Sequence, residues 1–225
     1  MKLVFRICLF VLILFFSFTA IGEQLQANYS ITTKGFKIGK LNWKITTDKN
    51  NFENKIILKS GGVFSPLYKF SGEYFSSGSI KNNKFFSEKY YHKWLTKKKQ
   101  KEMQILFNKN KILTINQRPA EKEDARIDFF ALIKFSDPLT SFLNIINGQK
   151  ISKTIDGRRI YTMFAQKSLH KSNKVTVLIE SYTNIWADHK RNDLEKIVFY
   201  IKPGNALPEL IEIYFKGSLF KVYKN

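Results

Sequence analysis

Apolar and polar side chains alternate with a period of two along much of the chain. Leu41, Trp43 and Ile45 share one face of such a run, opposite lysine and asparagine side chains. This alternation is typical of β-strands that bury one face. It recurs at residues 52–58, 103–107, 175–179, 197–201 and 211–215. Short turn sequences rich in Asp, Asn and Gly separate several runs, at residues 48–51, 108–110, 156–157 and 216–218. Such short connections predict antiparallel neighbours.

Two consecutive segments interrupt this pattern and favour helix. Residues 121–135 contain helix formers with mixed apolar spacing. Asp137 and Pro138 then provide a helix cap and a first helical residue, and Gly148 follows the end of the helix. Apolar residues between them recur at the i, i+3, i+4, i+7 spacing of an amphipathic helix; they are Leu139, Phe142, Leu143 and Ile146. The fold class is therefore mainly β (α+β). We expect a curved antiparallel sheet, or half-open barrel, wrapped over an inserted helical pair.

The N-terminus has the pattern of a secretory signal peptide. Lys2 and Arg6 precede an apolar run over residues 7–18, and Ala20 to Gly22 resembles a cleavage site. The run is shorter than the ~20 residues that a membrane-spanning helix needs. We therefore expect residues 1–22 to be removed and residues 23–225 to form a single β-rich domain in the periplasm.

The chain has one cysteine, Cys8, and it lies within this N-terminal segment. The residues before Cys8 do not form a lipoprotein box, so we expect no lipidated N-terminus. The mature chain would contain no cysteine, which suits an oxidising compartment without thiol chemistry.

The net charge is +20, from 38 Lys and Arg against 18 Asp and Glu. Export argues against a nucleic acid partner and favours an anionic membrane surface or an envelope protein. A solvated, lysine-rich surface is the simpler interpretation. Two stretches concentrate charge: the lysines of residues 93–101, beside aromatic residues, and an Arg-Arg pair after a predicted Asp-Gly turn. The candidates for anion or membrane contact are Lys93, Trp94, Lys97, Lys98, Lys99, Arg158 and Arg159.

Catalytic and metal motifs are missing from the sequence. His92, His170 and His189 lack metal-binding spacing, and we expect neither a metal nor a cofactor. Glu88, Tyr90 and His92 share one predicted strand face, and a solvent-exposed polar face explains them more simply than a general base. The sequence therefore leans against an enzyme.

Four stretches, in this order, resemble an exported bacterial family known as domain of unknown function 3108. They are residues 29–39, residues 64–74, residues 137–143 followed by 156–161, and residues 207–219. Glu209 departs from the family, where an apolar residue is more usual. The resemblance implies an exported, single-domain, β-rich envelope protein of Gram-negative bacteria. The family has no established activity, so no catalytic residues carry over.

Three functions follow from these observations. The first is a non-catalytic binding module for a lipid or other hydrophobic ligand, loosely like the outer-membrane lipoprotein carriers in architecture. Trp43, Phe142 and Phe199 are then candidates to line the ligand pocket, although aromatic residues fill a solid core equally well. The alternative is a structural or assembly partner in the envelope, which would use a strand edge or the basic tip. An envelope hydrolase is the least favoured.

Overall fold

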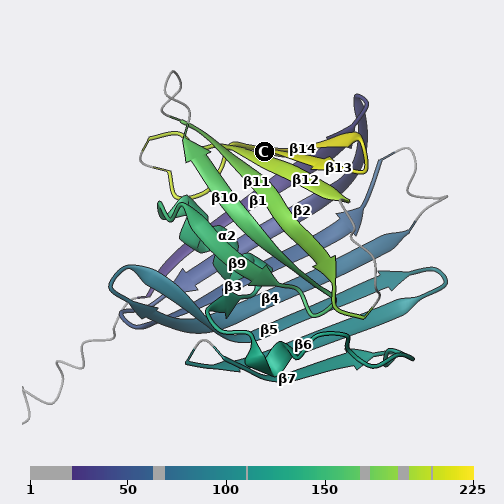
Figure 1. Ribbon diagram of the computed structural model, residues 1–225. Coiled ribbons are helices and arrows are strands. Elements are labelled where there is room, and N and C mark those ends of the chain that lie inside the picture. Colours follow the sequence, from purple (N-terminus) through teal and green to yellow (C-terminus); the bar gives the residue numbers. More distant parts are fainter. Residues whose placement is uncertain (1–21, 63–68, 110, 168–172, 187–192, 204) are drawn as a thin grey trace, which may run out of the picture.

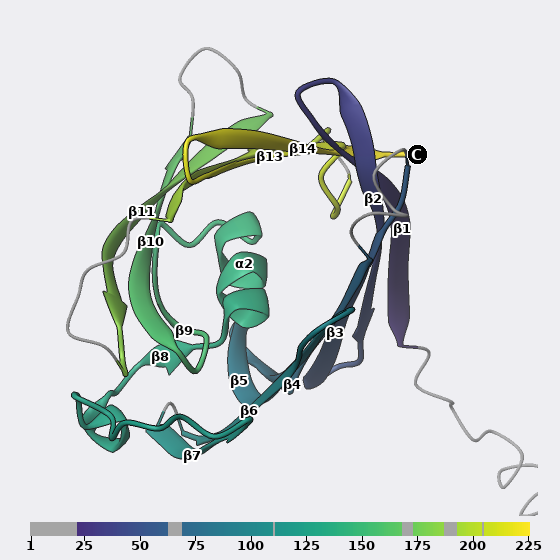
Figure 2. The ribbon, with the colours of Figure 1, turned by 90° about the vertical axis from the view of Figure 1, so that its right-hand side faces the viewer.

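A single sheet of fourteen strands curves into a nearly closed barrel around one helix (Figures 1 and 2). The computed structural model describes residues 22–62, 69–109, 111–167, 173–186, 193–203 and 205–225. The first seven strands are β1 (Glu23–Thr33), β2 (Phe36–Thr47), β3 (Asn51–Ser60), β4 (Phe70–Lys81), β5 (Lys84–Thr96), β6 (Gln100–Asn108) and β7 (Lys111–Arg118). The second seven are β8 (Phe135–Ser136), β9 (Ile151–Ile155), β10 (Arg159–Lys167), β11 (Lys174–Asn184), β12 (Leu194–Tyr200), β13 (Leu210–Phe215) and β14 (Ser218–Lys224).

Strands that are consecutive in sequence pair with each other, apart from β7 and β8. The pairing of β1 with β14 brings the two halves of the chain together. The pairing is antiparallel apart from the short β8, which runs parallel to β9. The sheet ends at β7 and β8, and an isolated bridge between Lys111 and Ile133 links β7 to the segment before β8. The predicted strand alternation is confirmed, since Trp43, Ile45 and Phe52 face the core.

Helix α2 (Pro138–Ile146) lies inside the barrel, as Figure 2 shows. Asp137 caps its N-terminus by accepting hydrogen bonds from the backbone N–H groups of Leu139 and Thr140, as the sequence predicts. The helix buries its apolar stripe against the concave side of the sheet. This confirms the predicted wrapping of the sheet over a helix.

The predicted helical pair is wrong, because the short 3₁₀ turn at Phe129–Ala131 is the only helical structure in residues 121–135. The apolar residues at positions 127, 129, 132 and 135 are spread over more than half of a helix circumference, so they give no single face to bury. Asp128 caps the turn with its side chain, and Leu132 returns to an extended conformation. The turn therefore begins at the Asp128 cap and ends where Leu132 becomes extended.

Two apolar clusters fill the barrel. The larger surrounds α2 and includes Trp43 and Phe199. The smaller includes residues of β5, β6, β7 and β9, among them Tyr90, Met103 and Ile155. The predicted signal peptide lies almost wholly outside the described residues. Among the residues that the structure describes, no helix combines the length and apolar character needed to cross a membrane.

Candidate functional site

The three aromatic residues considered for an apolar pocket pack against one another. The rings of Trp43 and Phe142 are 5.3 Å apart between centroids, and those of Phe142 and Phe199 are 4.3 Å apart. Trp43 and Phe199 are each 1% exposed, and the Trp43 indole donates a hydrogen bond to Asn54. These contacts are those of core residues, and none of the three lines the cavities described below.

A closed polar network lies at the start of α2. One carboxylate oxygen of the fully buried Asp137 accepts hydrogen bonds from the hydroxyls of Ser76 (2.8 Å), Ser87 (2.6 Å) and Thr140 (2.6 Å). The other accepts the two capping bonds of the helix. Burial raises the pKa of Asp137, and the hydrogen bonds act in the opposite direction. Both oxygens of the Asp137 carboxylate thus have hydrogen-bond donors within the fold. The network therefore serves to position α2.

A basic cavity of about 500 Å³ lies at the end of the barrel where β5 meets β6 and β9 meets β10. We call it the basic pocket. Its lining residues are His92, Trp94, Thr96, Lys98, Lys99, Lys101, Arg158 and Arg159. The structure thus brings together five of the seven residues considered for anion contact, from segments about sixty positions apart in sequence. Five cationic side chains line the cavity, and no carboxylate is among its lining residues within the described part of the chain.

Strand alternation on β5 divides the predicted basic cluster between two faces. His92, Trp94 and Thr96 line the basic pocket. Lys93 faces the other way and forms an ion pair with Glu102, with Nζ and Oε1 3.0 Å apart. Lys97 lines a separate surface hollow with Phe70 and Leu95. Lys93 and Lys97 therefore lie outside the pocket.

The turn between β9 and β10 holds the two arginines. One oxygen of Asp156 accepts hydrogen bonds from the backbone N–H groups of Arg158 (2.8 Å) and Arg159 (2.7 Å), which confirms the predicted turn. Gly157 has a φ of +88°, and its Cα packs so closely on Met103 that a Cβ would clash. Its carbonyl accepts a hydrogen bond from the indole of Trp186. The backbone of the turn is thus fixed on both sides.

The charges at the pocket are only partly compensated. Arg158 pairs with Glu121, and Arg159 lies 3.6 Å from a carboxylate oxygen of Asp156. In contrast, Lys98, Lys99 and Lys101 form no ion pair with any described residue.

Lys101 is sensitive to this crowding of positive charge. Burial is the largest effect that lowers its pKa, and Arg158, Lys99 and Arg159 add to it while Glu121 opposes it. The pocket therefore carries a surplus of positive charge.

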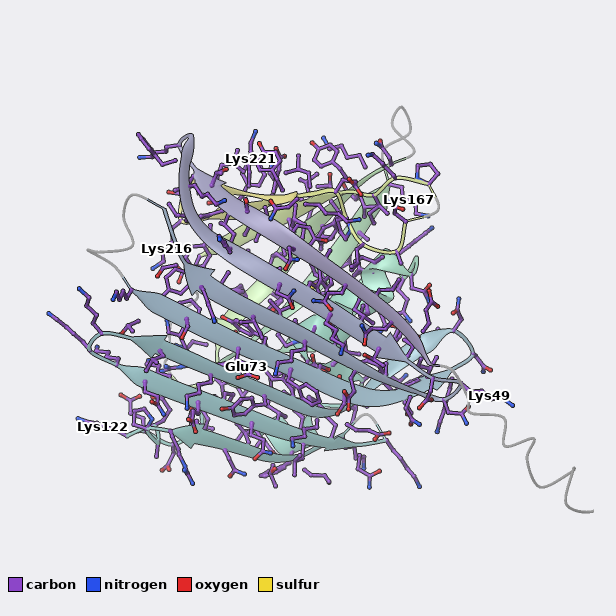
Figure 3. The ribbon with its side chains drawn as sticks, turned by 180° about the vertical axis from the view of Figure 1, so that it is seen from behind. Lys49, Glu73, Lys122, Lys167, Lys216 and Lys221 are labelled. Carbon is purple, nitrogen blue, oxygen red and sulfur yellow. The ribbon has the colours of Figure 1, made fainter. Side chains whose placement is uncertain are left out.

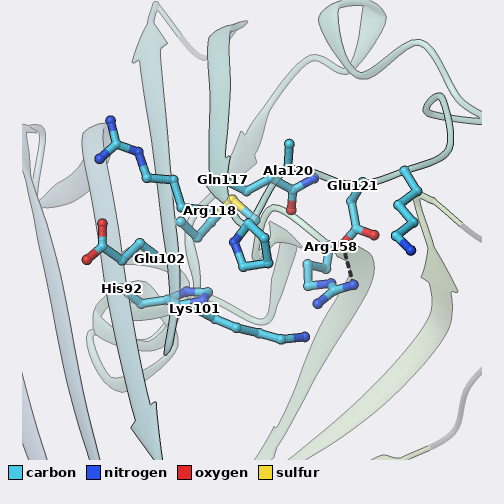
Figure 4. A pocket seen from close by; sticks show the side chains of 11 residues that line it. His92, Lys101, Glu102, Gln117, Arg118, Ala120, Glu121 and Arg158 are labelled. Atoms are coloured by element: carbon cyan, nitrogen blue, oxygen red, sulfur yellow. Dashed lines mark ion pairs between the residues drawn. The ribbon is translucent and has the colours of Figure 1, made fainter. Parts of the chain in front are cut away.

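A second cavity of about 250 Å³ adjoins the first and shares His92, Lys101 and Arg158 with it (Figure 4). Arg158 reaches Glu121 across this space, as the dashed line in Figure 4 marks. The smaller apolar cluster, which includes Met103, borders it. The lining of this second cavity thus combines cations with the carboxylates of Glu102 and Glu121, whereas the lysines and arginines of the basic pocket have no carboxylate among the described lining residues.

Sequence reasoning missed His92 because of a β-bulge. Ser77 pairs with Lys89 and Gly78 pairs with Ser87, so Glu88 is skipped in the ladder. Glu88 is therefore exposed, whereas Tyr90 is buried and its hydroxyl lies 3.1 Å from Nδ1 of His92. The sequence signal for this bulge is Gly78 within the strand, where a Cβ would clash with the carbonyl of Phe86.

The other histidines and possible metal ligands give no further site. His170 and His189 lie outside the described residues. Within the described ranges, no group of three or more His, Cys, Asp or Glu side chains could hold a metal ion.

Elsewhere the lysines are widely dispersed. Figure 3 shows Lys49, Lys122 and Lys216 at separate places around the sheet. Glu73, on the outer face of β4, pairs with Lys55 at 2.6 Å. The basic pocket therefore differs from the rest of the surface in the convergence of cations, rather than in their number.

The fold and the site define a class: a barrel-like, mainly antiparallel β-protein with an internal helix and a basic mouth. The chain matches the model of the family described as "Protein of unknown function (DUF3108)" over residues 28–215, and it belongs to that family. It is similar to the crystal structure of a beta-barrel-like protein of domain of unknown function DUF1849 from Brucella abortus. The identity is 10%, the match covers 89% of this chain and 95% of that chain, and the TM-score is 0.50. At this identity the likeness shows the fold alone. No curated protein matches the chain.

Proposed function

We propose that this chain is an exported, non-catalytic binding module of the cell envelope that recognises an anionic amphiphile, such as a lipid with a negatively charged headgroup. The observation that carries the proposal is the convergence of five cationic side chains in one cavity without a lining carboxylate among the described residues. Because the central aromatic residues pack against each other, we place the headgroup at the mouth of the barrel.

Apolar side chains beside the pocket support an amphipathic ligand. Trp94, which lines the pocket, is 37% exposed, and Leu95 in the neighbouring surface hollow is 42% exposed. The Trp94 ring stacks on Phe70 with centroids 5.7 Å apart. Exposed aromatic and aliphatic groups surrounded by lysines are typical of surfaces that contact lipid headgroups.

Vesicle flotation tests this proposal. The mature protein should float with phosphatidylcholine vesicles that contain phosphatidylglycerol and not with phosphatidylcholine alone, and added salt should release it. Replacing Lys98 and Lys99 with Gln should weaken binding by about 1 kcal/mol per lysine. The matched control replaces Lys49 and Lys109 with Gln, in turns at the other end of the barrel. Equal loss in both double variants, or no flotation of the unmodified protein, would overturn the proposal.

The export step has its own measurement. Intact-mass analysis of periplasmic protein should give Glu23 as the first residue. Retention of Met1 in a membrane fraction would contradict cleavage and periplasmic release.

An assembly role is the alternative, and the edge of β7 favours it. Among the described residues, the isolated Lys111–Ile133 bridge is the only β-pairing at the outer edge of β7. Leu113 on β7, and Phe130 and Ile133 after it, are large and exposed. Exposed strand edges pair with other chains. An association lost in Leu113→Lys but kept in the double variant of Lys98 and Lys99 would favour this alternative.

A further inference from the structure

We infer that the basic pocket binds a phosphomonoester, with Lys98, Lys99, Lys101 and Arg159 as its contacts. The inference deepens the proposed function and rests on it for the location of the ligand. The chemistry is shared by a lipid headgroup that ends in a phosphomonoester and by a small phosphorylated molecule free in solution. The charge, the donors and the size of the pocket each support it.

The charge surplus matches a dianion. Arg158 and Arg159 each have a carboxylate partner, and the lysines of the pocket have none among the described residues. A carboxylate or a phosphodiester carries one negative charge, which would leave most of this surplus in place. A phosphomonoester carries about −1.5 to −2 at neutral pH and therefore compensates more of it.

The donors suit a group with several acceptor oxygens. The Nε of Arg159 is buried and has no hydrogen-bond acceptor among the described residues, so the guanidinium is incompletely satisfied by Asp156. The guanidinium lies over the ring of Tyr182, with its Cζ 5.7 Å from the ring centroid. Each lysine ammonium offers three further donors. Three terminal phosphate oxygens can accept from several of these groups together.

The size of the pocket calls for an organic group beside the phosphate. A volume of about 500 Å³ lies within the usual range for small-molecule sites, roughly 300–1,000 Å³. Trp94 supplies an aromatic face to the wall of the pocket, whereas the Thr96 hydroxyl is engaged by the backbone of Lys98 and Lys99 in the β5–β6 turn. A glycerol or sugar carrying the phosphate would pack against the Trp94 ring.

Calorimetric titration of the mature chain with methyl phosphate and with dimethyl phosphate tests the inference. The two probes differ chiefly in charge and in terminal oxygens. Methyl phosphate should bind at least roughly tenfold more tightly. Arg159→Lys keeps the positive charge but removes the forked donors of the guanidinium. It should therefore reduce the preference for methyl phosphate over dimethyl phosphate. Arg159 also stabilises its own turn, so its replacement could affect the fold. Replacing the exposed Lys98 and Lys99 with Gln provides a second test of methyl phosphate binding. The double variant of Lys49 and Lys109 should bind as the unmodified protein does.

Vesicles distinguish the source of the phosphomonoester. Vesicles with phosphatidic acid are compared with phosphatidylglycerol vesicles of equal surface potential. A preference for phosphatidic acid supports the inference with a lipid ligand. Binding of methyl phosphate without any vesicle binding supports a soluble ligand and overturns the lipid part of the proposed function. Equal binding to both vesicles, with no methyl phosphate binding, overturns the inference and leaves the proposed function standing.

Discussion

Asp137 in the middle of the barrel and Arg159 at its mouth are charged side chains in opposite situations. The Asp137 carboxylate accepts five hydrogen bonds from neighbours in its own fold. Arg159 retains a donor without an acceptor among the described residues and lies among other cations. A charge that the fold satisfies completely stabilises the fold, whereas a surplus beside a cavity can be relieved by a ligand. This contrast locates the candidate site at the mouth.

The largest expected effect comes from Asp137→Ala. It removes the cap of α2 and leaves the hydroxyls of Ser76, Ser87 and Thr140 without their acceptor. The free energy of unfolding should fall by about 3 kcal/mol or more, measured by urea denaturation. Asp137→Asn keeps one accepting oxygen and should cost less. An Asp137→Ala protein as stable as the unmodified chain would show that the network does not hold the helix.

A pair of glycine substitutions should have the next largest effect. Gly157→Ala meets both a φ of +88° and the side chain of Met103, whereas Gly217→Ala meets a φ of +67° and open space. The loss in unfolding free energy should be about 1 kcal/mol for Gly217→Ala and about 2 kcal/mol or more for Gly157→Ala. Only Gly157→Ala should also weaken methyl phosphate binding, because its turn carries Arg158 and Arg159. If the two variants changed methyl phosphate binding equally, the turn at Gly157 would not contribute to the pocket.

Local patterns predict much of this fold. The alternation of Leu41, Trp43 and Ile45 identifies a strand, and Asp137 with Pro138 identifies a helix start, because each depends on neighbours in sequence. Residues 121–135 mislead because helix formers without a single apolar face have nothing to bury as a helix.

The candidate site depends on contacts between distant segments. Lys101 and Arg158 come together only through the curvature of the whole sheet, which no local pattern specifies. The alternation of β5 could have separated Lys93 from Trp94 beforehand. The bulge at Gly78 shifts that alternation by one residue, and it explains why His92 was assigned to solvent.

His92 should report both pH and ligand. Burial is the main cause that lowers its pKa below 6.5; Arg158 and Arg159 add to this, and Asp156 opposes it. As pH falls below 6.5, the unfolded chain takes up the proton first, so stability falls with decreasing pH. Urea denaturation from pH 7.5 to 5.5 should show this slope, and His92→Gln should flatten it. In NMR titrations a bound phosphomonoester should raise the pKa of His92, because a nearby anion favours its charged form. If methyl phosphate left the pKa of His92 unchanged, the phosphate would not bind near His92.

The smallest effect is expected for Lys93→Gln, compared with Lys101→Gln. Lys93 lies opposite Glu102 in the ladder, and Lys101 lies opposite Trp94, so the two side chains occupy different faces. Lys93 pairs with Glu102 at a partly exposed site, where solvent screening keeps the contribution of an ion pair small. Its replacement should change methyl phosphate affinity by less than about twofold, whereas Lys101→Gln should weaken it severalfold in the same titration. Because both variants lose one positive charge from the same hairpin, equal losses would mean that net charge, and not the inner face of β5 and β6, determines binding.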